Sequence, residues 1–240
     1  VTLYEKTAQL GGQTLLAQLL PTRAEFGGIV TNLEQEMTIA GVTVKKNCPV
    51  DMDMISNENP DAVILATGAE PRWPEFEGRE SAHVVDAWQV LRNEANVGGS
   101  VVVADWRADW IGIGIAEKLA EEGCRVRLAI NGYMPGQTIQ MYVRDTGVGR
   151  LHKLGVEMIP YARLFGADED TVYLQHTMSG EPIICEETDT LVLCQGHTPV
   201  NTMEDQLRES GFEVHLVGDC RSPRNLLAAI QGGHALGEIL

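Results

Sequence analysis

Short apolar runs alternate along this chain with segments whose apolar residues recur at helical spacing. The β-branched runs predict strands at 1–5, 42–46, 61–66, 100–104, 125–130, 156–160, 190–194 and 214–217, and the helical spacing predicts helices at 23–40, 86–93, 111–122, 146–153 and 225–240. Two alternating runs, 171–177 and 183–187, flank Ser179-Gly180 and predict a hairpin. Strands that alternate with helices in this way indicate parallel sheets covered by helices.

The alternation runs through twice and restarts at Gly98-Gly99. We therefore predict an α/β fold of two Rossmann-like, three-layer nucleotide-binding units of the glutathione-reductase type. The first unit is expected to comprise 1–96 plus 205–240, with 97–204 inserted as the second. Because Val1 is not a methionine and already lies in a predicted strand, we expect the chain to be a piece of a longer protein.

Charge and composition narrow the function classes. The 34 acidic and 18 basic residues give a formal net charge of −16, which argues against binding to nucleic acid or to an anionic membrane. The five cysteines form no pair at disulfide-framework or zinc spacing, and no two of the six histidines have metal-ligand spacing. We expect free thiols, no metal site and a cytoplasmic location.

Three segments carry candidate cofactor chemistry. Glu5 ends a strand, where an acidic residue of a Rossmann unit accepts hydrogen bonds from a ribose; as the alternative, it is a solvated residue at the end of a strand. Lys6 follows it, and Gly12-Gln13 offers a close backbone approach to a ligand.

The second segment is a buried strand that delivers Ala66-Thr67-Gly68, with Pro71 three residues after the glycine. The third is Gly218-Asp219, followed by a helix whose N-terminus favours an anion. Asp219 can equally be a helix cap. Each segment alone is weak evidence for a cofactor site, but the order and separation of the three along the chain make them informative together.

With these motifs, the chain resembles the C-terminal half of the flavoprotein family that includes 2,4-dienoyl-CoA reductase, trimethylamine dehydrogenase, histamine dehydrogenase and N-demethylases. The resemblance covers essentially the whole chain, including Cys194 to Asn201. It implies an N-terminal barrel with FMN and a 4Fe–4S cluster, which precedes the present chain, and FAD or ADP in the first unit. It also implies cofactor contacts at Glu5, Lys6, Gly12, Gln13, Val50, Ala66, Thr67, Gly68, Gly218 and Asp219.

Two departures from that family pattern limit the function. The Gly-x-Gly-x-x-Gly loop and its strand, expected just before Val1, are absent, so the first unit is expected to lack its central strand and the chain to be inactive alone. After the strand 100–104, the chain has Asp105-Trp106-Arg107-Ala108-Asp109-Trp110 where a dinucleotide site needs glycines. The second unit is therefore expected to be degenerate, with tryptophan side chains filling the space, and NAD(P)H binding is doubtful.

These observations leave three hypotheses. The first is the nucleotide-binding region of an amine dehydrogenase or N-demethylase that passes electrons to an external acceptor such as an electron-transfer flavoprotein. The second is an NAD(P)H-dependent enoate reductase, and the third is a non-catalytic ADP-binding module. In each case we expect no catalytic residue in this chain, and a homo-oligomer.

Overall fold

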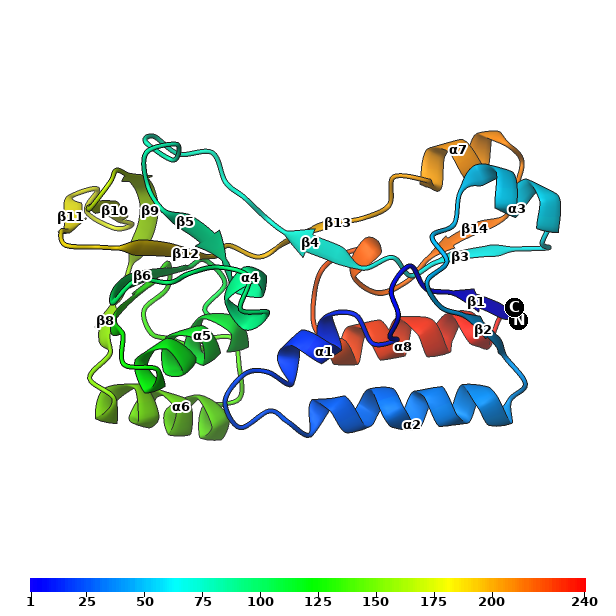
Figure 1. Ribbon diagram of the computed structural model, residues 1–240, viewed down its shortest axis with the longest axis horizontal. Coiled ribbons are helices and arrows are strands. Elements are labelled where there is room, and N and C mark those ends of the chain that lie inside the picture. The colour runs from blue at the N-terminus through cyan, green and yellow to red at the C-terminus, as the bar shows by residue number, and fades with distance from the viewer. The chain divides into compact units, whose positions relative to one another are not determined.

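The computed structural model describes all residues, Val1–Leu240. The chain forms two compact units: unit 1 comprises Val1–Leu19, Arg23–Glu70 and His197–Leu240, and unit 2 comprises Leu20–Thr22 and Pro71–Gly196. The chain passes between them through β4 (Ala69–Pro71) and β13 (His197–Pro199), which pair with each other (Figure 1). The predicted α/β class with parallel sheets is confirmed.

Unit 2 is built on a complete five-stranded parallel sheet with strand order β5-β12-β6-β7-β8. Its strands are β5 (Val84–Asp86), β6 (Ser100–Asp105), β7 (Arg125–Ile130), β8 (Glu157–Ile159) and β12 (Thr190–Cys194). Helices α5 (Trp110–Glu121) and α6 (Met141–Lys153) lie on one side of the sheet, and an antiparallel sheet of β9 (Ala162–Ala167), β10 (Val172–His176) and β11 (Pro182–Cys185) lies on the other (Figure 1).

The core of unit 2 follows from the two-residue period of β6. Val102 and Ala104 pack in one cluster with Val172 and Leu174 of the antiparallel sheet. Val101 and Val103 are fully buried as well and alternate to the opposite face, where α5 packs. A strand that is buried on both faces reads as a continuous apolar run, and this is why the sequence identified β6 so closely.

The observed boundaries of the units differ from the predicted ones. The sequence places the breaks after residues 96 and 204, whereas the contacts divide the chain after residues 70 and 196. The reason is that β5 pairs with β12 and that helix α4 (Ala87–Leu91) packs against α5, so residues 71–96 belong to unit 2. Periodicity predicts the helix at 86–93, but it cannot show that β5 pairs with β12 or that α4 packs against α5, because both contacts join distant segments of the chain.

Unit 1 contains four short parallel strands that do not join into one sheet. β1 (Thr2–Tyr4) pairs with β2 (Thr43–Lys45), and β3 (Val63–Leu65) pairs with β14 (Val214–Leu216). Among the 240 residues no strand joins the two pairs, so each keeps unpaired main-chain groups along its edges.

The helices of unit 1 lie on both sides of these strands. Figure 1 shows α3 (Met52–Glu58) and α7 (Glu204–Glu209) on one side, and α2 (Phe26–Ile39) and α8 (Leu226–Gly237) on the other. Helix α2 buries no residue, α8 buries only Leu236, and Ile64 in the middle of β3 is 47% exposed. The apolar faces that the sequence predicted as core are therefore only partly covered.

Several elements depart from the sequence prediction. Helix α6 begins at Met141, five residues before the predicted start. The sequence analysis missed this first turn because the turn is exposed and carries no periodic apolar signal. The sequence analysis did not predict the helices α1 (Gln13–Ala17), α3 and α7 or the strands β4, β5, β9 and β13. No helix combines the length and apolar character needed to cross a membrane.

Helix α5 is linked to α6 by an ion pair whose loss should destabilise unit 2. The carboxylate of Glu117 is 2% exposed, and Arg150 donates to both of its oxygens, one contact being Nη2 to Oε2 at 3.0 Å. We predict that Arg150→Ala lowers the free energy of unfolding by about 3 kcal/mol, because it strands a buried charge. Urea unfolding followed by circular dichroism measures the change.

Lys153→Ala is the matched control, since Lys153 is exposed on the same helix and near its C-terminus. Lys153→Ala should lower the free energy of unfolding by no more than about 1 kcal/mol. Equal losses for the two variants would contradict the assigned role of the buried pair.

Candidate functional site

The site begins where β3 and β14 end. The two strands run parallel with Leu65 opposite Leu216, so their following residues turn at the same edge. Gly68 and Gly218 in these turns have φ values of 74° and 66°. This left-handed backbone suits glycine, and it lets the chain reverse immediately after each strand.

The structure brings together three of the residues that the sequence singled out. Gln13 Nε2 donates to Asp219 Oδ2 at 3.1 Å, although the two residues are far apart in sequence. The second carboxylate oxygen of Asp219 accepts from the Arg224 amide at 3.1 Å. A Cβ placed on Gly68 would lie 3.8 Å from Gln13 Nε2, so the three residues form one cluster.

Val200 and Cys220, which the sequence analysis did not name as site residues, help to hold this cluster in place. The Thr67 hydroxyl donates to the Val200 carbonyl, and the Val200 amide donates to the Gly68 carbonyl at 3.0 Å. The buried Cys220 thiol donates to the Leu65 carbonyl at 2.9 Å and ties the turn after β14 to the end of β3. No local sequence signal reveals these contacts, because each joins distant segments.

Asn225 begins helix α8, and its side chain accepts the Ala228 amide at 2.9 Å. This is an ordinary N-cap, and an asparagine immediately before an apolar helical run is a signal that the sequence does contain. Asp219 is therefore not the cap of α8, and its hydrogen bonds run to Gln13 and Arg224 instead.

Glu5 lies at the end of β1, as predicted, and is partly buried. Its Oε1 atom accepts from both the amide and the hydroxyl of Thr7, at 2.7 Å and 2.8 Å. Both bonds use the same oxygen, which leaves Oε2 available to a ligand. Lys6 is exposed, and Val50 packs against the small core around Ile55. No hydrogen bond joins these three residues to the Gln13–Gly68–Asp219 cluster.

The two glycines before α1 have different roles. A Cβ on Gly11 would lie 2.7 Å from Val30 Cγ2, so Gly11 is required for close packing against α2. A Cβ on Gly12 would meet no atom within 4 Å. The space beside Gly12 is thus open, as a ligand-facing backbone requires.

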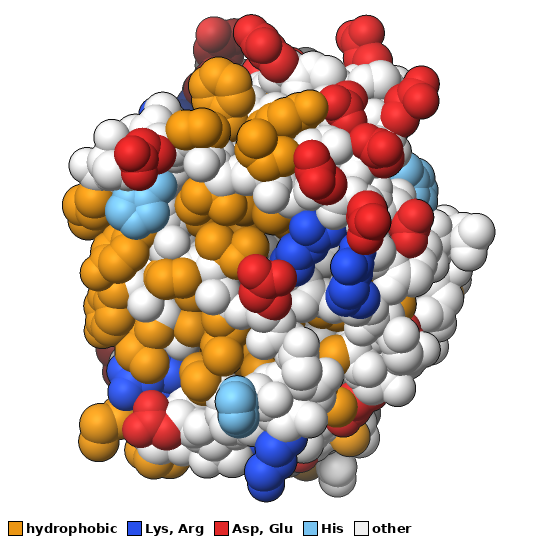
Figure 2. Space-filling view, turned by 90° about the vertical axis from the view of Figure 1, so that its left-hand side faces the viewer, with side chains coloured by type: hydrophobic (Ala, Val, Ile, Leu, Met, Phe, Trp, Pro, Cys, Tyr) orange, Lys and Arg blue, Asp and Glu red, His pale blue; other side chains and the backbone are white.

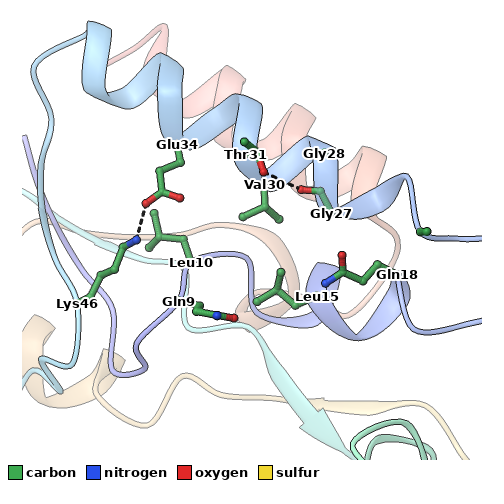
Figure 3. A pocket seen from close by; sticks show the side chains of 11 residues that line it. Gln9, Leu10, Leu15, Gln18, Gly27, Gly28, Val30, Thr31, Glu34 and Lys46 are labelled. Atoms are coloured by element: carbon green, nitrogen blue, oxygen red, sulfur yellow. Dashed lines mark hydrogen bonds and ion pairs between the residues drawn. The ribbon is translucent and has the colours of Figure 1, made fainter.

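A separate cavity of about 430 Å³ lies between the loop before α1 and helix α2. Figure 3 shows Leu10, Leu15 and Val30 pointing into it, with the Glu34–Lys46 ion pair at one end. None of the ten predicted contact residues lines this cavity. The candidate site is therefore the open edge formed by the strand ends.

Unit 2 has a corresponding loop after β6, and its own side chains fill it. The Asp105 carboxylate is 2% exposed, and its Oδ1 accepts the amides of Arg107 and Ala108 at 3.1 and 2.9 Å. Its Oδ2 is buried without a hydrogen-bond partner. Trp106, which was expected to fill the loop, is instead 42% exposed. Asp105 occupies the interior of the loop because its carboxylate can accept the amides that the turn leaves unpaired.

The glycines of α5 serve packing within unit 2. A Cβ on Gly112 would lie 2.1 Å from Asp105 Oδ2, and one on Gly114 would lie 2.7 Å from Leu20 Cδ2. Gly112 thus makes room for the chain's own carboxylate at the point where a dinucleotide site would admit a phosphate.

The N-terminus of α5 is also occupied by a carboxylate. Asp109 caps it by accepting the Ile111 amide at 3.0 Å and forms an ion pair with Arg107 at 2.9 Å. Burial, and secondarily the charge of Asp109, raise the pKa of Asp105 to about 8. A phosphate at this helix would therefore compete with Asp109 for the same backbone groups.

Comparison with known proteins gives relatives over the full length of the chain. It is 30% identical over 241 residues to a bilirubin reductase of Mediterraneibacter gnavus, covering 100% of this chain and 37% of the relative. It is 26% identical to an N,N-dimethylglycine/sarcosine dehydrogenase of Chromohalobacter salexigens, covering 96% of this chain and 39% of the relative. The chain thus spans less than two fifths of the length of these relatives, and no protein-family model matches it.

Solved structures support the same fold. A 2-naphthoyl-CoA reductase complexed with 2-naphthoyl-CoA superposes with a TM-score of 0.88 at 24% identity, over 99% of this chain and 36% of that one. At this identity the likeness shows the fold alone.

The raised pKa of Asp105 predicts a pH-dependent stability. The folded protein keeps the Asp105 proton up to about pH 8, whereas the unfolded chain loses it near pH ~4. The free energy of unfolding of the wild type should therefore fall as the pH rises across this window. Asp105→Asn removes the titrating carboxyl group and should abolish this pH-dependent loss. We expect the variant to gain about 1–3 kcal/mol on the wild type between pH 5 and 8, measured by urea unfolding at each pH.

Glu121→Gln serves as the control, because Glu121 is an exposed carboxylate on α5, the helix that follows Asp105. The plot of its free energy of unfolding against pH should run parallel to that of the wild type. A parallel curve for Asp105→Asn would refute a buried, protonated Asp105.

Proposed function

Because the chain belongs to the flavoprotein family of 2,4-dienoyl-CoA reductase and trimethylamine dehydrogenase, we propose that it is the nucleotide-binding region of a larger flavin oxidoreductase. Its homologues include amine dehydrogenases and enoate-type reductases, and all are oxidoreductases. Within such a protein this region binds a nucleotide and contributes no group that breaks a substrate bond.

Unit 1 is the proposed site for the adenosine nucleotide, FAD or ADP. The observation that carries this proposal is the Gln13–Gly68–Asp219 cluster at the carboxyl ends of β3 and β14. Ligands of open α/β sheets bind at this edge of the strands. The exposed Ala66 and the open space beside Gly12 leave backbone accessible along the same edge.

The chain's own residues would then hold the nucleotide by hydrogen bonds. Glu5 would accept a ribose hydroxyl through its free Oε2, because Thr7 fixes the carboxylate through Oε1. Asp219, held by Gln13 and the Arg224 amide, would accept from hydroxyl groups at the opposite end. Gly218 lets the turn approach the ligand closely, and Lys6 and Val50 would flank the adenosine side.

The two separate strand pairs of unit 1 fit a region that is completed by another segment. The edges of β1–β2 and β3–β14 offer unpaired main-chain groups, and Ile64 is largely exposed between its neighbours. We infer that one further strand, which these 240 residues do not supply, joins the two pairs into a sheet. We infer from the family relationship that a barrel domain of the same protein carries FMN and a 4Fe–4S cluster.

We infer that the substrate is an amine and that electrons leave to an external acceptor. When bound in the barrel domain, FMN would supply the hydride acceptor for oxidation of the amine C–H bond. The observation behind this direction of flow is the loop of unit 2, in which Asp105 and Asp109 occupy the place of a dinucleotide phosphate. The 30% identity to a bilirubin reductase supports the second candidate, an NAD(P)H-dependent reductase with the opposite flow.

Nucleotide content tests the proposed site in unit 1. We predict that Asp219→Ala in the full-length protein lowers the affinity for FAD about 10- to 100-fold, because it removes charge-assisted hydrogen bonds to hydroxyl groups that FAD has and ADP lacks. Glu5→Ala should act in the same direction. Denaturing the purified protein and identifying the released nucleotide by chromatography measures the occupancy and separates FAD from ADP.

Asp205→Ala is the matched control, since Asp205 is exposed in α7 of the same unit. It should retain full nucleotide content. The proposal for unit 1 fails if Glu5→Ala and Asp219→Ala also retain it.

Anaerobic titration of the full-length protein with NADPH distinguishes the two directions of electron flow. We predict no rapid bleaching of the flavin absorbance by NADPH or NADH, because the side chains of Asp105 and Asp109 already occupy the backbone amides that would bind a phosphate in unit 2. Amine substrates should bleach the flavin instead. Rapid reduction by either dinucleotide would favour the reductase.

A further inference from the structure

The antiparallel sheet of unit 2 has an outer face that no described element covers. Alternation along the strands turns Leu164 and Ile183 toward the core, where they pack against the buried cluster. The opposite face carries Arg163, Phe165, Tyr173, Gln175, Pro182 and Ile184, which we call the outer face.

Large apolar side chains stand at the centre of the outer face. Phe165 is 55% exposed and Ile184 is 57% exposed, in a unit whose central strands β6 and β12 are buried at every position. Beside them a hollow of about 390 Å³ is lined by Phe165, Tyr173 and Pro182 and by the Glu77-Gly78 segment. An exposed apolar area of this kind that is rimmed by polar residues is typical of a protein-binding surface.

Backbone contacts fix the hollow in shape. The Ala167 amide donates to the Glu77 carbonyl at 2.9 Å, and a Cβ on Gly78 would lie 1.8 Å from the Ala167 carbonyl oxygen. The Tyr173 hydroxyl donates to Asp168 Oδ2 at 2.8 Å. The surface is thus held in place before any partner binds, which lowers the entropic cost of association.

The rim of the outer face carries more acidic than basic side chains, and Arg125 of β7 pairs with one of the acidic ones, Glu187, at 3.1 Å. Residues 163–187 contain one basic residue, Arg163, and these six acidic ones: Asp168, Glu169, Asp170, Glu181, Glu186 and Glu187. Figure 2 shows hydrophobic side chains adjoining one another at this end of unit 2, with carboxylates gathered beside them. Such a rim attracts a basic surface and repels a second copy of a chain whose net charge is −16.

We propose that the outer face of β9–β11 docks a protein partner that presents an apolar centre surrounded by lysine and arginine. The apolar centre, Phe165 and Ile184, supplies the affinity, and the acidic rim supplies orientation and rate of association. This inference concerns unit 2 alone and does not depend on which nucleotide unit 1 binds.

The experiment uses the full-length protein and cytochrome c as the probe, because that protein presents an apolar haem edge ringed by lysines. We expect saturable binding at low salt that weakens steeply as the salt concentration rises. Phe165→Ser/Ile184→Ser should weaken binding tenfold or more. Glu181→Gln/Glu186→Gln should weaken it and flatten its salt dependence.

Two matched controls use residues outside the outer face. Met141→Ser/Tyr142→Ser removes exposed apolar side chains from α6, and Glu121→Gln/Glu209→Gln removes exposed carboxylates elsewhere. Both should bind within twofold of the wild type. Circular dichroism checks folding, and Phe165→Ser alone replaces the double variant if that variant unfolds.

Four outcomes would overturn the proposal. The first is no saturable binding, and the second is binding that the serine variants leave unchanged, which would mean charge attraction alone. The third is an oligomer of the wild type that Phe165→Ser/Ile184→Ser dissociates, which would make the face a contact between copies. The fourth is slow thiol labelling of Phe165→Cys in the full-length protein, which would show that another part of the same protein covers the face.

Discussion

The parallel pairing of β3 with β14 is the constraint on which the candidate site depends. It places the ends of two strands from distant parts of the sequence at one edge, with Leu65 opposite Leu216. The Cys220 thiol and the Thr67–Val200 contact then fix the turns that follow. Gln13 can reach Asp219 only because both turns are held at that edge. A loss of register there would separate the residues that make the site.

The two units share one local arrangement, a parallel strand followed by a turn and a helix, but the turn is open in unit 1 and filled in unit 2. In unit 1 the strand ends stay open, with glycine at the turns and accessible backbone beside Gly12. In unit 2 the equivalent loop after β6 is closed by Asp105, and Gly112 makes room for that carboxylate. The same elements, a parallel strand followed by a helix, thus present an open edge in one unit and a filled one in the other.

Much of the fold was predictable because long buried strands carry a strong local signal. β6, β7 and β12 were identified closely, since each is apolar and each is bounded by turn residues. The short strands β4, β5 and β13 were not, because their pairing depends on distant partners and not on their own composition. For the same reason the unit boundary moved from residue 96 to residue 70 once β5 was seen to pair with β12.

The sequence by itself determined the α/β class, the repeated unit and the residue types that a nucleotide site needs, because these depend on local periodicity and on glycine and acidic positions. Tertiary structure alone decided that Gln13, Gly68 and Asp219 meet, while no hydrogen bond joins Glu5 and Val50 to them. It also decided that Asp105, and not Trp106, fills the loop of unit 2. The physical reason is that burial and hydrogen bonding between distant segments select which side chain occupies a space, and a linear pattern does not contain that competition.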